Sequence, residues 1–407
     1  MNKNLVLVLL VAVAFNGNSN LAEAANAMSV QPTDAESGLT ARPGLVLEEF
    51  VFESSPFFRS CHSATMLELR SGELLCAFFG GTRESHPDVE IWMSRKPLAG
   101  EWTPPVSVAD GNEPGGERMS TGNPVLFQER AGEVMLFYKV IKPDVGFLGR
   151  VKTSSDGGHT WSKASKVGDG LMGAVKNKPI QLDNGTILSP SSTEDDHGWR
   201  VHIERSTDGG NTWKIIGPIN PKAKIGAIQP TLMTYPDGRI QMFCRTRSEH
   251  GFIAQSWSED GGLTWSPLEA AVLPNNNSGI DAVTLRDGRQ LLVYNHSTRT
   301  QPGMGHKGRG ILNVALSRNG TDWEAALVLE HLDERGKQFS YPSVIQTRDG
   351  LVHIVYTWHR QRIKHVVLDP TRLETTPMPD GKWPTEGPAS LGDVVPEQPE
   401  AIPAVEN

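Results

Sequence analysis

Seven basic side chains stand where they could bind a carboxylate, in a chain that is acidic overall. The 407 residues include 39 Lys and Arg against 47 Asp and Glu, which gives a net charge of −8. Because an arginine can hold a carboxylate through two parallel hydrogen bonds, gathered arginines favour an acidic sugar as the ligand. The candidate ligands of its carboxylate are Arg59, Arg83, Lys139, Lys178, Arg245, Arg247 and Arg309.

Titratable side chains accompany these cations. They are His62, Asp88, Tyr138 and Tyr341, and each lies close to the start or the end of a short apolar segment. A single polar residue at such a place is usually solvated. Many titratable groups that converge on one place instead favour an active site.

Six glycine-centred hairpins must position these residues. The hairpin glycines are Gly72, Gly132, Gly185, Gly238, Gly288 and Gly350. Each joins two short apolar strands, such as 62–69 with 73–79 and 229–234 with 239–245. A third strand follows each pair, so the unit is about 50–60 residues of antiparallel strands. Radial repetition of this unit predicts an all-β chain, a six-bladed β-propeller over residues 45–370.

A second repeat marks the turns between strands. The form Ser-x-Asp-x-Gly-x-Thr-Trp occurs at 154–161, 206–213 and 258–265, and 317–323 is a shortened copy. In such a turn the Asp accepts backbone N–H bonds, the Gly takes a positive φ and the Trp packs over the turn. We therefore expect these segments to be structural and to lie away from the candidate site.

Hairpin geometry brings the candidate residues together. A hairpin places the start of its first strand beside the end of its second strand, so these ends meet around the propeller axis. Residues at or near these ends, or at the start of a third strand, are Arg59, His62, Arg83, Asp88, Tyr138, Lys139, Lys178, Arg245, Arg247, Arg309 and Tyr341. We predict one cationic opening at this end of the propeller, with the repeated turns at the other.

The repeated turns and the six hairpins resemble the sialidase (neuraminidase) superfamily, whose turns are called Asp-boxes or BNR repeats. The resemblance covers residues 45–370. Segments such as Cys61-His62-Ser63, Lys176-Asn177-Lys178-Pro179 and Asn295-His296-Ser297 resemble more closely a subgroup of sialidase-like BNR proteins. The resemblance implies a six-bladed propeller and an exo-sialidase-like hydrolysis of a terminal acidic sugar.

The family also implies roles for individual residues. Sialidases hold the substrate carboxylate with three arginines, and they use a tyrosine paired with a glutamate as nucleophile and an aspartate as acid/base. The resemblance puts Arg245 and Arg309 at the second and third arginine, Tyr341 at the nucleophile and Asp88 at the acid/base.

Two positions depart from the family pattern. The segment of the first arginine is 58–62, in which His62 rather than Arg59 stands nearest the expected place. The glutamate that would activate the tyrosine should lie about two residues before Gln229, where this chain has Ala227. Without that base, a phenol with a pKa of about 10 is a weak nucleophile.

Three functions remain open at this point. In a hydrolase, Arg59 or Lys178 would complete the carboxylate site of Arg245 and Arg309. In a uronate lyase, an Arg or Lys would neutralise the carboxylate, and His62 or Tyr138 would take the proton from C5. A propeller with the same opening could instead bind acidic glycans without catalysis. A product assay distinguishes the three: a hydrolase releases free sialic acid, a lyase forms an unsaturated uronate, and a binding protein forms no product.

Composition excludes other partners and suggests export. The acidic balance disfavours nucleic acid as a partner, which needs clustered Lys and Arg. Residues 1–27 resemble a secretory signal, because Lys3 precedes the apolar segment 5–15 and small residues follow. That segment is too short to span a bilayer, so we expect a secreted or periplasmic protein whose mature form does not insert into a membrane.

The remaining expectations concern cofactors and the end of the chain. No spacing resembles a zinc site or a phosphate-binding loop, so we expect neither a metal nor a cofactor. From Pro370 onward, eight prolines and little periodicity predict a disordered tail over residues 371–407.

Overall fold

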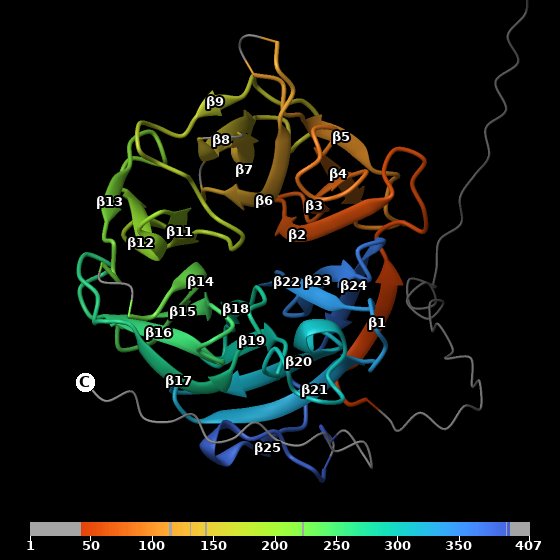
Figure 1. Ribbon diagram of the computed structural model, residues 1–407, viewed down its shortest axis with the longest axis vertical. Coiled ribbons are helices and arrows are strands. Elements are labelled where there is room, and N and C mark those ends of the chain that lie inside the picture. Colours follow the sequence, from red (N-terminus) through yellow and green to blue (C-terminus); the bar gives the residue numbers. More distant parts are fainter. Residues whose placement is uncertain are drawn as a thin grey trace, which may run out of the picture. The chain divides into compact units, whose positions relative to one another are not determined.

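The protein forms an all-β propeller. The computed structural model describes residues 42–390 except 114–115, 131, 143–144, 222–223 and 388, so the predicted signal segment 1–27 lies outside the described residues. This part holds 25 strands and two 3₁₀ turns, η1 (His306–Gly308) and η2 (Pro379–Gly381), and none of its helices could cross a bilayer. The strands form six antiparallel sheets around one axis (Figure 1), which confirms the predicted six-bladed propeller.

Each of the first three blades is a sheet of four consecutive strands. Blade 1 contains β2 (Ser60–Glu68), β3 (Leu74–Gly81), β4 (Glu90–Lys96) and β5 (Val106–Ala109). Blade 2 contains β6 (Ser120–Gln128), β7 (Val134–Lys142), β8 (Gly146–Ser154) and β9 (Ser165–Lys166). Blade 3 contains β10 (Ile180–Gln181), β11 (Ile187–Asp195), β12 (Gly198–Ser206) and β13 (Lys214–Ile216).

The last three blades repeat this order with two additions. Blade 4 contains β14 (Ala227–Thr234), β15 (Ile240–Thr246), β16 (Phe252–Ser258) and β17 (Glu269–Pro274). Blade 5 contains β18 (Asp281–Thr284), β19 (Gln290–Tyr294), β20 (Ile311–Ser317), β21 (Trp323–His331) and, beyond it, β25 (Thr376–Pro377). Blade 6 contains β22 (Phe339–Gln346), β23 (Val352–Trp358), β24 (Arg362–Leu368) and β1 (Leu45–Phe50).

The ring is closed by β1, from the N-terminal side of the propeller. This strand lies antiparallel to β24, with Leu45 opposite Leu368 and Phe50 opposite Lys364, so it becomes the outer strand of the last blade (Figure 1). At the centre, β2 of blade 1 contacts β22 of blade 6. Strands from the first and last parts of the propeller therefore complete one sheet, as in other closed β-architectures that leave few free edges.

Apolar side chains fill the spaces between neighbouring blades. Among the described residues, six buried clusters occur, and each joins one pair of adjacent blades. The cluster that joins blade 6 to blade 1 includes Met66 and Phe78 together with Val355 and Ile363. Burial of these faces is the main stabilising contribution to the ring, since apolar surface is removed from water on both sides of every sheet.

The repeated turns are structural, as their sequence predicts. Asp156 accepts hydrogen bonds from the backbone N–H of Thr160 at 2.9 Å and from its hydroxyl at 2.5 Å. Ser154 donates to the same carboxylate at 2.8 Å, and Gly157 has a φ of 70°. The turns at 208 and 260 repeat these contacts. They follow the third strands of blades 2, 3 and 4, at the hairpin end of the propeller.

The folded part of the C-terminal segment extends further than the sequence suggests. Residues Thr376–Pro377 form β25, which pairs with β21 at Glu324 and Ala325. Met378, Trp383 and Ala389 are buried in the cluster between blades 4 and 5. The described residues of 371–390 thus include strand and buried positions where a disordered tail was expected, because apolar side chains such as Trp383 pack on blades 4 and 5. Residues 391–407 lie outside the described residues.

The closure by β1 gives a first prediction. A chain that starts at residue 40 keeps β1 and should melt close to the full-length protein. A chain that starts at residue 51 lacks β1 and should melt at least about 10 °C lower, because a loss of 1 kcal/mol in stability lowers the melting temperature by about 2–4 °C in a somewhat smaller domain. Calorimetry of both truncated chains measures the difference. Equal melting temperatures would contradict the closing role of β1.

Candidate functional site

The inner strands change direction at the end where the candidate residues meet. Four inner strands carry a β-bulge there, at 62–65, 122–125, 228–231 and 340–343. Each bulge holds one non-glycine residue with positive φ, and these are Ser63, Asn123, Gln229 and Tyr341. Such a conformation costs on the order of 1–3 kcal/mol and persists only where the surroundings enforce it. The bulges therefore mark where the fold directs side chains toward the axis.

Tyr341 occupies the centre of this end of the propeller. Its side chain is buried, and its hydroxyl accepts hydrogen bonds from Nη1 of Arg245 and, at 3.5 Å, from the amide of Gln229. Burial alone would raise the pKa of Tyr341, but the guanidinium groups of Arg245 and Arg309 outweigh this and lower it below its ordinary value. The phenolate is thus stabilised by cations, and the group beside it is the amide of Gln229 instead of a carboxylate.

One asparagine orients both arginines. The side-chain oxygen of Asn277 accepts from Nε of Arg245 at 2.8 Å, and its backbone oxygen accepts from Nη2 of Arg309 at 2.9 Å. Asn277 has a φ of 66°, a conformation that asparagine adopts more readily than most residues. The loop between β17 and β18 therefore fixes the spacing of the two guanidinium groups, a role that the sequence did not suggest.

A third arginine comes from a turn that the sequence did not single out. Arg360 lies between β23 and β24, where His359 and Arg360 both have positive φ, as in the tight turns that join twisted hairpins. Its backbone oxygen accepts from the N–H of Cys61 at 2.9 Å, and its side chain donates to Glu84 at 2.8 Å. Arg360 thus lines the same cavity as Arg245 and Arg309, whereas the sequence suggested Arg59 or Lys178 as their companion.

These groups surround a polar cavity of about 300 Å³. Its lining residues are Glu84, Arg245, Asn277, Arg299, His306, Lys307, Arg309, Gln338, Tyr341 and Arg360. A second cavity of about 190 Å³ shares Glu84, Arg245 and Tyr341 with it and adds Lys139 and Glu194, whose charged atoms lie 3.6 Å apart. The predicted cationic opening is therefore present, and Tyr341 lies where the two cavities meet.

Two predicted residues are part of the protein interior. Lys178 does not face the opening, because its ammonium group is held by the carboxylate of Asp281 at 2.9 Å and by the backbone oxygen of Ala282 at 2.9 Å. Tyr138 points into the apolar cluster between blades 1 and 2, and burial raises its pKa to about 12. On the same strand, Lys139 points the opposite way, as neighbours on a strand do, and lines the smaller cavity.

Four other predicted residues lie near the opening without lining either cavity. Arg59 and Arg83 are exposed. Arg247 packs beside Arg245 on the ring of Trp199, with its guanidinium carbon 5.2 Å from the ring centre. Asp88 accepts from the hydroxyl of Thr82 at 2.6 Å and lies 2.7 Å from the ring nitrogen of His86. Burial raises the pKa of Asp88, but these hydrogen bonds lower it overall, so its carboxylate stays ionised.

His62 lies against Tyr341, with ring centres 4.1 Å apart, and it is 1% exposed. Nδ1 of His62 is 2.8 Å from the hydroxyl of Thr357. Burial lowers the pKa of His62 well below its ordinary value, and the nearby Arg360, Arg309 and Arg245 lower it further. The imidazole is therefore neutral and sits under the tyrosine ring, and it does not line either cavity.

Beside Tyr341, polar groups tie the bulges together across the axis. The ammonium group of Lys176 donates to the backbone oxygen of Ile280 at 2.7 Å and to that of Pro342, the residue after Tyr341. Asn177 donates to the backbone oxygens of Gln229 and Pro230 at 3.0 Å each. Burial lowers the pKa of Lys176 to about 7, with Lys178 and Arg245 adding to the effect of burial. The segment 176–178 thus holds the strained residues of blades 4 and 6.

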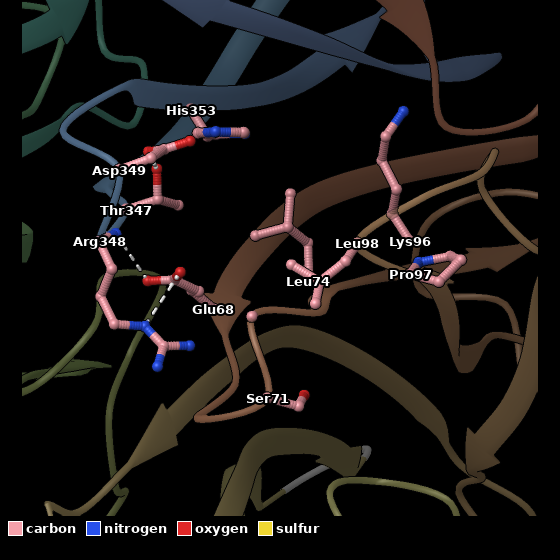
Figure 2. Close-up of a pocket in the computed structure, with 11 residues that line it drawn as sticks. Glu68, Ser71, Leu74, Lys96, Pro97, Leu98, Thr347, Arg348, Asp349 and His353 are labelled. Atoms are coloured by element: carbon pink, nitrogen blue, oxygen red, sulfur yellow. Dashed lines mark hydrogen bonds and ion pairs between the residues drawn. The ribbon is translucent and has the colours of Figure 1, made fainter. Parts of the chain in front are cut away.

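A larger cavity lies at the opposite end of the inner strands. It measures about 430 Å³ and is bordered by the β2–β3 and β22–β23 hairpins, as Figure 2 shows. Arg348 and Glu68 form an ion pair of 3.2 Å on one side of it, and Leu74 and Leu98 lie on the other (Figure 2). None of the predicted site residues lines it. Among the described residues, no group of three or more His, Cys, Asp or Glu is placed to hold a metal ion.

Comparisons with known families and structures agree with this fold. Residues 72–354 match the BNR repeat-like domain. The chain belongs to this family. No curated protein matches the sequence.

Three solved structures share the fold of this BNR-repeat protein. A protein of unknown function from Dyadobacter fermentans is 19% identical, with a TM-score of 0.62 over 81% of this chain and 99% of the other. A Hadza microbial sialidase is 17% identical, with a TM-score of 0.67 over 81% and 69%. The intramolecular trans-sialidase of Ruminococcus gnavus is 15% identical, with a TM-score of 0.60 over 80% and 99%. The sialidase-like propeller fold is therefore shown.

The buried ion pair at Asp281 gives a second prediction. Replacing Asp281 with Ala should lower the free energy of unfolding by about 3–5 kcal/mol, because it leaves the half-buried ammonium group of Lys178 and the buried N–H of Val344 without their acceptor. Chemical denaturation measures the change.

The matched control is Asp287→Ala, which breaks the ion pair of the exposed Asp287 with Arg289 in the turn between β18 and β19. That change should cost no more than about 1 kcal/mol. Equal losses in the free energy of unfolding would mean that Asp281 stabilises the fold no more than Asp287 does.

Proposed function

We propose that this protein is a sialidase-type glycoside hydrolase that removes a terminal sugar acid from glycans. The observation that carries the proposal is the position of Tyr341, whose hydroxyl accepts a hydrogen bond from Arg245 in a cavity lined by four arginines. A neutral phenol that becomes an anion only beside cations suits attack on an anomeric carbon that carries a carboxylate. A carboxylate nucleophile would repel that substrate.

Arg245, Arg309 and Arg360 are proposed to hold the substrate carboxylate. Arg309 is buried, and its Nε lacks a partner among the described residues. A buried donor without an acceptor is costly, so a bound carboxylate that accepts from it would gain more than a solvated contact does. The substrate carboxylate would then hold the anomeric carbon over the hydroxyl of Tyr341.

The proposed reaction runs in two steps with retention of configuration. Tyr341 attacks the anomeric carbon while an acid protonates the leaving oxygen, and water then releases the sugar from the tyrosine with the same group acting as base. Gln229 cannot accept the phenolic proton as a carboxylate would. The lowered pKa of Tyr341 increases the fraction of phenolate at a given pH, so the phenolic proton passes to solvent before the oxygen attacks. The N-terminal sequence supports action after export.

The arginine contact gives a pH prediction. Removing a cation destabilises the phenolate, so Arg245→Gln should raise the pKa of Tyr341 and move the acidic limb of the kcat/KM profile to higher pH. Tyr341→Phe should lower kcat by about 1,000-fold or more, as loss of a nucleophile does. Hydrolysis of an aryl sialoside measures both effects.

Arg247→Gln is the matched control, since Arg247 packs on the same Trp199 ring but makes no contact with Tyr341 among the described residues. It should leave the acidic limb in place. Full activity of Tyr341→Phe on a substrate that the wild type cleaves would overturn the proposed role of the tyrosine.

The acid/base is proposed to come from the loop between β3 and β4. That loop carries both Asp88, which the family resemblance favours, and Glu84, which lines both cavities that contain Tyr341. Asp88 is occupied by Thr82 and His86, and its lowered pKa makes it a poor proton donor. Glu84 is paired with Arg360 and would be released when a substrate carboxylate binds that arginine. We assign the role to Glu84.

Paired substitutions separate these two carboxylates. Glu84→Gln should lower kcat by about 100-fold or more on a substrate with a poor leaving group, and much less on an aryl glycoside whose leaving group needs no proton. Asp88→Asn should change both substrates equally, since it loosens the loop. The reverse pattern would assign the acid/base to Asp88.

A uronate lyase is the second candidate. The absence of the family's glutamate, whose expected position is Ala227, favours it, since a tyrosine with a lowered pKa could take a proton from carbon without a further base. His62, buried under the tyrosine ring, does not fit that role. Ultraviolet absorbance of an unsaturated product from a uronate polymer would identify the lyase, and release of a sugar acid without absorbance would identify the hydrolase.

A further inference from the structure

The cavity holds more positive charge than one sugar carboxylate can balance. Arg360 is already paired with Glu84. Arg245 donates to the hydroxyl of Tyr341, and Arg309 donates to the backbone oxygen of Asn277. A bound carboxylate would take these guanidinium groups as its partners. Arg299 and Lys307 also line this cavity, and their side chains make no ion pair or hydrogen bond with any described residue.

Both extra cations belong to the loop between β19 and β20, and the fold holds that loop in place. The backbone oxygen of Gly308 accepts from Asn276 and, at 2.5 Å, from the hydroxyl of Ser297. Gly308 has a φ of 70°, and a Cβ there would lie 2.3 Å from the backbone oxygen of Thr298. The loop is therefore closely packed on its base, which leaves Arg299 and Lys307 directed to the cavity side.

The surroundings of the loop do not neutralise it. Burial lowers the pKa of His306 between them, and Lys307, Arg309 and Arg299 lower it further, so this histidine is neutral near pH 7. The carboxylate of Asp333 accepts from the N–H of Gly305 at 3.1 Å, and it does not line the cavity. Glu84 is the only carboxylate among the described residues of the cavity lining, and it is shared with Arg360.

We propose that Arg299 and Lys307 form a subsite for a second anionic group, so that the preferred substrate is a sugar acid carrying two negative charges within reach of Tyr341. This inference rests on the proposed function. The second charge can be a sulfate ester on the same ring or the carboxylate of a neighbouring acidic sugar in the chain, because both offer oxygen acceptors to a guanidinium and an ammonium group.

Calorimetric titration with three ligands tests the subsite. The ligands are N-acetylneuraminic acid, its O-sulfated form and a disaccharide of two linked sialic acids. The wild type should bind at least one of the two dianions about tenfold more tightly than the monoanion, a gain expected of a charge-assisted contact. Which dianion gains identifies the source of the second charge.

The double variant Arg299→Ala/Lys307→Ala should lose this gain and bind the monoanion within about twofold of the wild type, since an exposed or half-exposed cation adds little to a contact it does not make. Lys214→Ala, which removes an exposed cation from β13 at the rim of blade 3, is the matched control and should keep the full preference. Equal melting temperatures establish that the variants are folded.

Three outcomes would overturn the subsite. If the wild type binds both dianions no more tightly than the monoanion, the subsite is absent while the hydrolase proposal stands. If the double variant loses affinity equally for all three ligands, Arg299 and Lys307 belong to the first carboxylate site. If the wild type neither binds nor cleaves any sugar acid, the proposed function and the subsite fail together.

Discussion

The carboxylate of Asp281 is the interaction on which the site depends, because it connects four blades at the propeller axis. Asp281 opens β18 of blade 5, and it accepts from Lys178 of blade 3, from the hydroxyl of Thr231 of blade 4 at 2.9 Å and from the N–H of Val344 of blade 6 at 2.9 Å. Val344 is three residues after Tyr341. A buried carboxylate with this many donors is favourable only while all of them stay in place, so the blades are held at fixed positions.

These fixed contacts at the axis allow nearby residues to keep a strained backbone conformation. Gln229 and Tyr341 have positive φ, and neither is glycine. Asn177 donates to the backbone oxygen of Gln229 and Lys176 donates to that of Pro342, the residue after Tyr341, which stabilises the bulges. The fold thus uses buried polar bonds to present a tyrosine and an amide to the arginines. Tyr341 is ionised more easily because of those arginines, and His62 supports its ring from below.

The fold could be predicted from sequence because its signals are local and repeated. Glycine hairpins and Asp-boxes each need only a few adjacent residues, and six copies of the hairpin leave little choice of architecture. Arg245, Arg309, Lys139 and Tyr341 could be placed for the same reason, since strand ends of a propeller meet at the axis. The sequence also marks 176–179 as a distinctive segment, although Lys178 serves the interior and not the ligand.

The residues that sequence reasoning missed depend on irregular loops. Arg360 reaches the cavity through a turn with two positive φ values, and Asn277 acts through both its side chain and its backbone. Neither geometry follows from a hydrophobic pattern. Tyr138 and Lys139 lie at the same strand end, so both are predicted at the opening, but strand alternation puts only one of the two on that side. Asp88 and Glu84 share a loop, and only the folded loop shows which carboxylate lines the cavity.

The central claim is that Tyr341 attacks the sugar, and a covalent adduct tests it most directly. A fluorinated sialosyl fluoride forms the glycosyl–enzyme but slows its hydrolysis, so peptide mass spectrometry of the trapped protein can locate the modified residue. The account predicts one added sugar acid on the peptide that contains Tyr341, and none in Tyr341→Phe. Turnover of sialosides by a wild-type protein that carries its adduct on another residue, or no adduct at all, would contradict it.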